Sequence, residues 1–193
     1  MRSVLSPNGA SAYSPGLPRF AATLGKSVEN IQPRKGLRHQ ENPMPQSLSA
    51  VYIHLVFSTK HRQPFLKDEG LRTELHSFSG GTSKTLGCPP LIVGGVEDHV
   101  HLLARFGRTI PQAEWVKELK RVSNIWLKEE GGIKIFEWQA GYADFSVSQS
   151  NLKQVKKYIV NQEEHHRKLS FQDEVRALLT KHEMNWDERY IWE

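Results

Sequence analysis

The chain has 193 residues, of which 38% are hydrophobic and 24% charged, and this balance indicates a globular protein with one main domain. No apolar run is long enough to cross a membrane, and no secretory leader opens the sequence, so neither a membrane protein nor a secreted one is expected. The single cysteine, Cys88, excludes an internal disulfide and favours a reducing cytoplasm.

The net charge of +5 is unevenly placed along the chain. Residues 1–43 carry six Lys or Arg against two Glu, and so hold +4 of it. This segment is rich in Pro, Gly, Ser and Asn and has no hydrophobic period, which predicts a disordered N-terminal extension. A targeting leader is the alternative, and Met44 offers a second start. We expect residues 44–193 to form the folded domain. Because its charge is nearly balanced, any nucleic-acid binding must use local basic patches.

The sequence of the first part of this domain, residues 50–106, predicts three strands and one helix. Residues 50–60, "AVYIHLVFSTK", read as the first strand. Residues 68–78 read as a helix that Gly80-Gly81 interrupts and that resumes over 82–87. Residues 90–96 and 99–106 predict two further strands joined by the turn "GGVED".

The sequence of the second part, residues 109–183, predicts one strand and three helices. The clearest helix spans residues 109–132, with capping-box spacing of Thr109 and Gln112 and with Pro111 in its first turn. Its predicted buried stripe is Trp115, Leu119, Val122 and Trp126. Residues 136–148 predict the fourth strand, and 152–168 and 171–183 two more helices. The β-α-β-β-α-β order predicts an α+β, ferredoxin-like (RRM-like) antiparallel sheet with additional C-terminal helices.

Two histidines, His99 and His101, lie one residue apart in the third strand. Side chains alternate between the faces of a strand, so both imidazoles share one face, while Val100, Leu102 and Ala104 face the core helices. Imidazole nitrogens that converge in this way suit a divalent ion. Two ordinary histidines are the alternative. His54 of the first strand could either reach the same face or pack as a sheet histidine.

The helix over residues 152–168 offers further polar groups. Tyr158 and Gln162 are four residues apart and therefore lie on one helical face, and His165 continues that flank. Leu152, Val155 and Ile159 form the adjoining apolar stripe that would dock the helix. A core-edge aromatic is the alternative interpretation of Tyr158.

These residues together resemble a known family. "GGVEDHVHLLARF" with "YIVNQEEHHR" downstream is similar to the HUH transposases with a single catalytic tyrosine, of the insertion-sequence-200 and REP-associated type. The resemblance also includes "HLVFSTKHRQPF", "LKRVSNIWL", "FEWQAGYADFSVS" and the closing "DERYIWE", and so covers nearly all of residues 50–193. Residues 1–43 match nothing in that family.

The resemblance implies an activity and a site. His99 and His101 match the pair that binds Mg²⁺ or Mn²⁺, Gln162 matches the third metal ligand, and Tyr158 matches the nucleophile on the C-terminal helices. The implied reaction is cleavage and rejoining of single-stranded DNA through a 5′-phosphotyrosine. The implied partners are a DNA hairpin and a second copy of the chain, in a homodimer whose active sites are each completed by the partner's tyrosine helix. A cytoplasmic, nucleoid-associated bacterial protein is expected.

Basic side chains supply candidate contacts to the DNA backbone. They come from the end of the first strand and from two helices, and a solvated charge is the alternative for each: Lys60, His61, Arg62, Lys117, Lys120, Arg121, Lys153 and Lys157.

Two other functions remain open from the sequence. An RRM-like binding protein without catalysis would share the fold, but "LVFST" and "HLLARF" lack the paired aromatic signature of RNA-binding strands. A metal-dependent hydrolase that uses activated water would need the histidines but not Tyr158. A domesticated relative that no longer mobilises its own gene would share the chemistry of the transposase.

Overall fold

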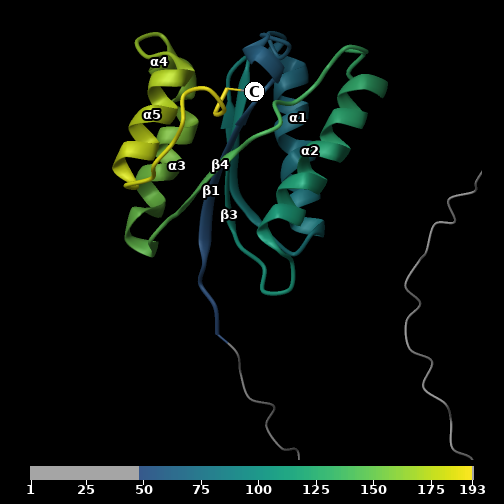
Figure 1. Ribbon diagram of the computed structural model, residues 1–193. Helices are drawn as coiled ribbons and strands as arrows, with labels where there is room; N and C mark the ends of the chain where they lie inside the picture. Colours follow the sequence, from purple (N-terminus) through teal and green to yellow (C-terminus); the bar gives the residue numbers. More distant parts are fainter. Residues whose placement is uncertain (1–47, 193) are drawn as a thin grey trace, which may run out of the picture. The chain divides into compact units, whose positions relative to one another are not determined.

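The computed structural model describes residues 48–192 (Figure 1). The segment predicted to be an N-terminal extension, residues 1–43, lies outside the described residues. Within the part that is described, no helix is both long enough and apolar enough to span a bilayer.

A four-stranded antiparallel sheet forms the centre of the described region. Its strands are β1 (Tyr52–Ser58), β2 (Pro90–Gly95), β3 (His99–Arg105) and β4 (Ala143–Ser146), in the spatial order β2-β3-β1-β4. The predicted α+β, ferredoxin-like arrangement is confirmed. The fourth strand is shorter than predicted, because regular pairing with β1 begins only at Ala143. Upstream of it, the segment is joined to the end of β1 by a hydrogen bond from the backbone N–H of Gln139 to the Ser58 carbonyl at 3.0 Å and by an isolated bridge between Thr59 and Trp138.

One face of the sheet is covered by α1 (Glu69–Thr85) and α2 (Gln112–Glu129), as Figure 1 shows. Their buried side chains and the apolar face of the strands form the main core. It includes Leu55, Leu75, Val100, Leu102, Ala104, Trp115, Leu119 and Phe136. The predicted division of β3 into an apolar face and a histidine face is therefore correct.

The predicted interruption of the first helix at Gly80-Gly81 is wrong. The helix α1 is continuous, and the Asp68 side chain caps it by accepting a hydrogen bond from the backbone N–H of Leu71 at 2.7 Å. A helical glycine costs about 1 kcal/mol relative to alanine. Here burial of the small residues Ser79, Gly80 and Ser83 offsets that cost.

Two details of α2 also differ from the prediction. The helix begins at Gln112 after Pro111, and no side chain caps it, so the capping box of Thr109 and Gln112 does not form. Trp115 and Leu119 are buried as predicted, but Val122 and Trp126 are only half-buried. The rest of the buried stripe consists of Val116, Ser123 and Leu127.

The opposite face of the sheet carries α3 (Leu152–Val160), α4 (Gln162–His166) and α5 (Phe171–Lys181) (Figure 1). The single helix predicted over 152–168 is thus two helices, because Asn161 leaves helical geometry with φ −93° and ψ 19°. The predicted docking stripe is confirmed, since Leu152 and Ile159 are buried with Leu103, and Val155 packs against them.

A glycine permits this docking. A Cβ atom on Gly94 of β2 would lie 2.7 Å from Cγ2 and 2.8 Å from the carbonyl oxygen of Ile159. Real Cβ contacts are not that short, so only glycine lets α3 lie this close to β2. Gly94 of β2 therefore also sets the position of α3, the helix that carries Tyr158.

Candidate active site

The histidine pair lies where the alternation of β3 predicts. His99 and His101 are both 0% exposed and face α3, α4 and α5 rather than the main core. In the antiparallel register, Ser58 and Val56 of β1 are their cross-strand partners. Both imidazoles are thus fixed by rigid sheet backbone and not by a loop.

His54 of β1 lies beside the pair, so the first of its two predicted positions is correct. Its Nε2 atom is 2.9 Å from Nδ1 of His101, and the two rings stack at 5.1 Å. Burial lowers the pKa of His54 to about 3 and that of His101 to about 4. Both rings are therefore neutral near pH 7, which is the form of imidazole that binds a metal.

Tyr158 and Gln162 reach the same place from the opposite side. Gln162 is buried, and its Oε1 lies 3.1 Å from Nε2 of His99. The Tyr158 ring is half-buried and meets the His101 ring edge-on, with centroids 5.8 Å apart. The structure therefore brings together, within one chain, all four residues that the sequence predicts for the site.

A fifth residue, Glu174 of α5, was not predicted and occupies the centre of the site. It is 1% exposed. Its Oε2 lies 3.6 Å from Nε2 of His99 and 3.5 Å from Nε2 of His101. Its Oε1 accepts hydrogen bonds from the Tyr158 hydroxyl and, at 2.9 Å, from Nε2 of Gln162. One carboxylate oxygen thus faces the histidines and the other faces the tyrosine.

His166 of α4 was also missed. Its Nε2 is 3.0 Å from both Gln162 Oε1 and Glu174 Oε2. With His99 and Glu174 it forms a group whose ligand atoms all lie within 4.8 Å of one another. The neighbouring His165, which was predicted to share the flank of Tyr158 and Gln162, has an Nε2 atom that is buried without a hydrogen-bond partner among the described residues, 3.7 Å from Glu174 Oε1.

The charge of Glu174 is held by its neighbours. Burial alone would raise the pKa of this carboxyl, but the close contact with His101, the hydrogen bond with His166 and the other nearby imidazoles bring the pKa well below its usual range. Burial, and then the Glu174 charge, raise the pKa of the Tyr158 hydroxyl far above its ordinary value of 10. The tyrosine is therefore protonated and bonded to a carboxylate.

The donor set fits a divalent cation. Nδ1 of His99 lies 2.7 Å from Asp98 Oδ1, so in a neutral ring this nitrogen carries the proton. Nε2 then presents a lone pair to the oxygens of Gln162 and Glu174. The opposite orientation of the Gln162 amide is unfavourable, because it would place the amide oxygen against a carboxylate oxygen of Glu174. Nε2 of His101 is buried without a hydrogen-bond partner. A cation among these atoms would satisfy all of them.

Comparison with known proteins identifies the family. The family model described as "Transposase IS200 like" matches residues 47–162, a stretch that contains the whole sheet and ends at the candidate ligand Gln162. The chain belongs to this transposase family. The matched region ends before α5, so Glu174 and His166 of this transposase lie outside it.

Two solved structures resemble this IS200-like transposase. One is a protein of Deinococcus radiodurans R1 described as a transposase, with 24% identity and a TM-score of 0.49 over 61% of this chain and 95% of that one. The other is a REP-associated tyrosine transposase bound to a REP hairpin, with 11% identity and a TM-score of 0.43 over 63% of this chain and 72% of that one. No curated protein matched the chain.

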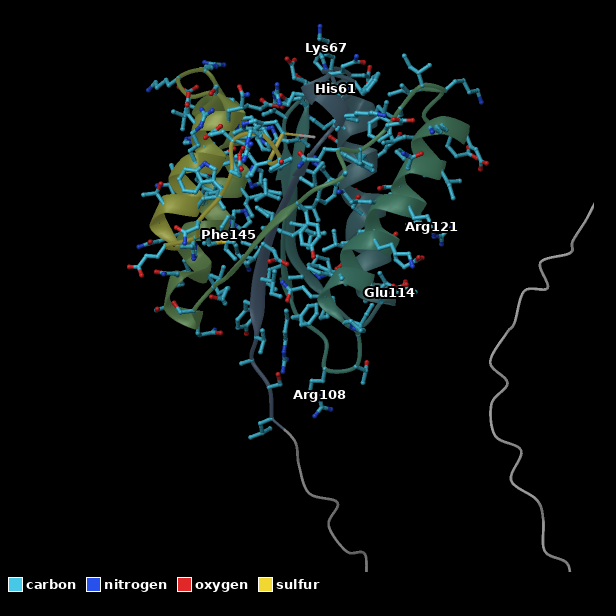
Figure 2. The ribbon with its side chains drawn as sticks, in the orientation of Figure 1. His61, Lys67, Arg108, Glu114, Arg121 and Phe145 are labelled. Carbon is cyan, nitrogen blue, oxygen red and sulfur yellow. The ribbon has the colours of Figure 1, made fainter. Side chains whose placement is uncertain are left out.

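The basic residues predicted to contact DNA are spread over both faces of the transposase. Lys117 and Arg121 pair with Glu114 and Glu118 on α2. Figure 2 labels Glu114 and Arg121 on that helix, which lies on the face of the sheet opposite to α3 and α5. The ammonium of Lys120 donates to the carbonyl oxygens of residues 139–141 at 2.7–3.1 Å, so this lysine already holds the turn before β4.

The remaining basic residues lie nearer the site or are free of partners. Lys60 pairs with Glu137, and the Arg62 guanidinium lies 5.8 Å from the centre of the Trp192 ring. Lys153 and Lys157 are exposed on α3, and their side chains make no ion pair within residues 48–192. Of the predicted contacts, these two lysines are therefore the most available.

Proposed function

We propose that this transposase cleaves and rejoins single-stranded DNA by transesterification at Tyr158, with a divalent cation held beside the tyrosine. The single observation that carries the proposal is the convergence of Tyr158, Gln162, His99 and His101 on one buried carboxylate, Glu174. An RRM-like binding protein without catalysis would not require a buried cluster of imidazoles around a hydrogen-bonded tyrosine.

The cation would be Mg²⁺ or Mn²⁺, held by His99, His101 and Gln162, and we add Glu174 to this ligand set. Carboxylate and amide oxygens with imidazole nitrogens form a donor set that suits these ions. When bound, the cation would polarise the target phosphate and offset the negative charge of Glu174. His54 and Asp98 are positioning residues that fix the orientation of His101 and His99 through their second ring nitrogens.

Tyr158 supplies the nucleophilic oxygen. Its hydroxyl proton points at Glu174, which is the acceptor in contact with it. The tyrosine oxygen forms a bond to phosphorus while the bond from phosphorus to the 3′-oxygen breaks. The products are a 5′-phosphotyrosine and a strand that ends in a 3′-OH, so one proton passes overall from the tyrosine to the leaving strand. The 3′-OH of another strand can reverse the step without ATP.

A polar cavity beside the site supports entry of a DNA strand. Its volume is about 720 Å³, and its lining includes Arg62, Lys67, Arg167, Asp98 and His166. His61 and Arg62 at its rim have φ of 55°, in the left-handed region that favours glycine. Such strain is typical of functional loops. We infer that the backbone of a single strand, next to its hairpin, passes along this cavity toward Tyr158.

The homodimer with exchanged tyrosine helices stays a prediction. Tyr158 and Gln162 already meet the histidine pair of their own chain, so the site has its donors without a partner. Sedimentation of the protein with and without single-stranded DNA measures the assembly.

The variant Tyr158→Phe tests the proposal. It removes one oxygen and almost no packing area, so the fold and DNA binding should persist. The covalent protein–DNA adduct should disappear, which a denaturing gel with labelled single-stranded DNA and Mn²⁺ measures. The matched controls Tyr142→Phe and Tyr190→Phe change exposed tyrosines and should leave the adduct intact. Cutting without an adduct in the wild type would instead indicate a hydrolase that uses water.

A further inference from the structure

A second cavity opens on the other side of the candidate nucleophile. It has a volume of about 370 Å³ and lies between α3, α5 and β4. Tyr158, His165 and Glu174 line its inner end, so the cavity reaches the tyrosine itself. Its size is near the lower end of the usual range of small-molecule pockets, which is about 300–1,000 Å³. It suits one flat ring system rather than a folded strand.

The walls of this cavity are apolar and partly aromatic. Phe145, Val155 and Leu178 contribute them, and the His182 ring stacks on Phe145 with centroids 4.6 Å apart. Figure 2 labels Phe145 on the side of the sheet where α3 and α5 lie. Flat aromatic and apolar surfaces of this kind hold unstacked bases by their faces.

The rim adds groups that can read the edge of a base. Asn151 and Gln154 are exposed at the start of α3. Their side-chain amides make no hydrogen bond to any residue that the structure describes. Lys181 at the end of α5 lies at the same rim and can meet a phosphate. Amide side chains pair with the hydrogen-bonding edges of bases.

One buried atom at the inner end lacks a partner. Nε2 of His165 is buried and makes no hydrogen bond among residues 48–192. A buried polar atom of this kind destabilises the protein unless a ligand or a water satisfies it. The cavity therefore offers an apolar slot that has polar groups at its rim and an unsatisfied nitrogen at its inner end.

We propose that this cavity binds one unpaired nucleobase, from a nucleotide next to the phosphate that Tyr158 attacks. The inference rests on the proposed function, since it takes DNA as the substrate. A base that enters the slot cannot stay stacked in a duplex, so the slot selects single strands. It also fixes the register of the strand, because only one phosphate then lies at the tyrosine.

The test fills the slot without disturbing the core. Ala177 lines the cavity but is exposed on α5, so Ala177→Phe should fold and occupy the space. Thr180→Phe is the matched control on the same helix, at an exposed position that does not line this cavity. The probes are a randomised pool of single-stranded DNA and an abasic strand of the same length, and fluorescence anisotropy measures binding.

We expect Ala177→Phe to bind the randomised pool at least about fivefold more weakly than the wild type, since one stacked base is worth about 1–3 kcal/mol. Binding of the abasic strand should not change, and Thr180→Phe should behave as the wild type. Equal binding of the pool by Ala177→Phe and the wild type would overturn the inference.

Sequencing of the covalent adducts separates this inference from the proposed function. The wild type should enrich one base at a position next to the cut, and Ala177→Phe should still form adducts but without that enrichment. Gln154→Ala should change which base is enriched. Adducts with unchanged enrichment in both variants would overturn the base slot and leave the tyrosine chemistry standing. A wild type that forms no adduct would overturn the proposed function. The anisotropy measurement would then still show whether the cavity binds a base.

Discussion

Glu174 is surrounded by imidazoles on nearly every side. Its oxygens lie 3.0–3.7 Å from nitrogens of His99, His101, His165 and His166. A carboxylate that is 1% exposed is tolerated only where such groups compensate its charge. The same imidazoles are potential ligands, so Glu174 contributes both to the packing of this region and to its capacity to hold a cation.

The variant Glu174→Gln should weaken Mn²⁺ binding by about 10-fold or more, a loss typical of altered metal sites. The amide keeps the volume of the side chain and can still accept a hydrogen bond from Tyr158, so the fold should persist. Isothermal titration calorimetry measures the affinity. Glu164→Gln, which changes an exposed carboxylate paired with Arg167, is the control and should bind as the wild type. Equal Mn²⁺ affinity in both variants would remove Glu174 from the ligand set.

The sequence predicts some of these residues and not others for a physical reason. The histidine pair follows from alternation along one strand, and Tyr158 and Gln162 follow from helical spacing, so both are local patterns. Glu174 meets them only through the turn between α4 and α5. Its one local signal is that it lies on the apolar stripe of α5 with Phe171 and Val175, where a charged residue is unexpected.

At the scale of elements, the position of α3 decides whether the site assembles. Its buried stripe could be read from the sequence, but the break at Asn161 and the close approach to β2 could not. The break depends on how α4 must turn to bring Gln162 and His166 to Glu174. The close approach depends on the glycine of a partner strand that lies far away in the sequence. At Gly80-Gly81 the error was the opposite one: a break was predicted where the helix is continuous. Burial of the small residues of α1 outweighed the low helix propensity of glycine.

Gly94→Ala should destabilise the protein by about 1–3 kcal/mol, the usual cost of overpacking. The new Cβ would overlap Ile159 and push α3 away from β2, so adduct formation should fall as well. Urea denaturation measures the free energy of unfolding. The control is Gly81→Ala in α1, where an added Cβ meets nothing within 4 Å and should stabilise the helix by about 0.5–1 kcal/mol. An unchanged free energy of unfolding in Gly94→Ala would show that this close approach does not hold α3 in place.

At the scale of the whole molecule, the order of strands and helices predicted the fold correctly, because each element has a clear period. The predicted division of the chain into residues 1–43 and a catalytic domain of residues 44–193 rests on composition and on the extent of the family resemblance. Residues 1–43 hold +4 of the net charge of +5, and every residue of the candidate site lies beyond them. The segment is therefore expected to affect DNA binding through charge rather than through the chemistry.

A protein that begins at Met44 should fold, bind Mn²⁺ and form the Tyr158 adduct as the full chain does. Its binding to single-stranded DNA of unrelated sequence should be weaker and should depend less steeply on salt, because each Lys or Arg that meets a phosphate releases counterions. Thermal unfolding, calorimetry and the adduct gel compare the two forms, and a salt titration of DNA binding isolates the electrostatic part. An insoluble or inactive Met44 form would show that residues 1–43 belong to the catalytic domain. An unchanged salt dependence would show that their charge never meets the DNA.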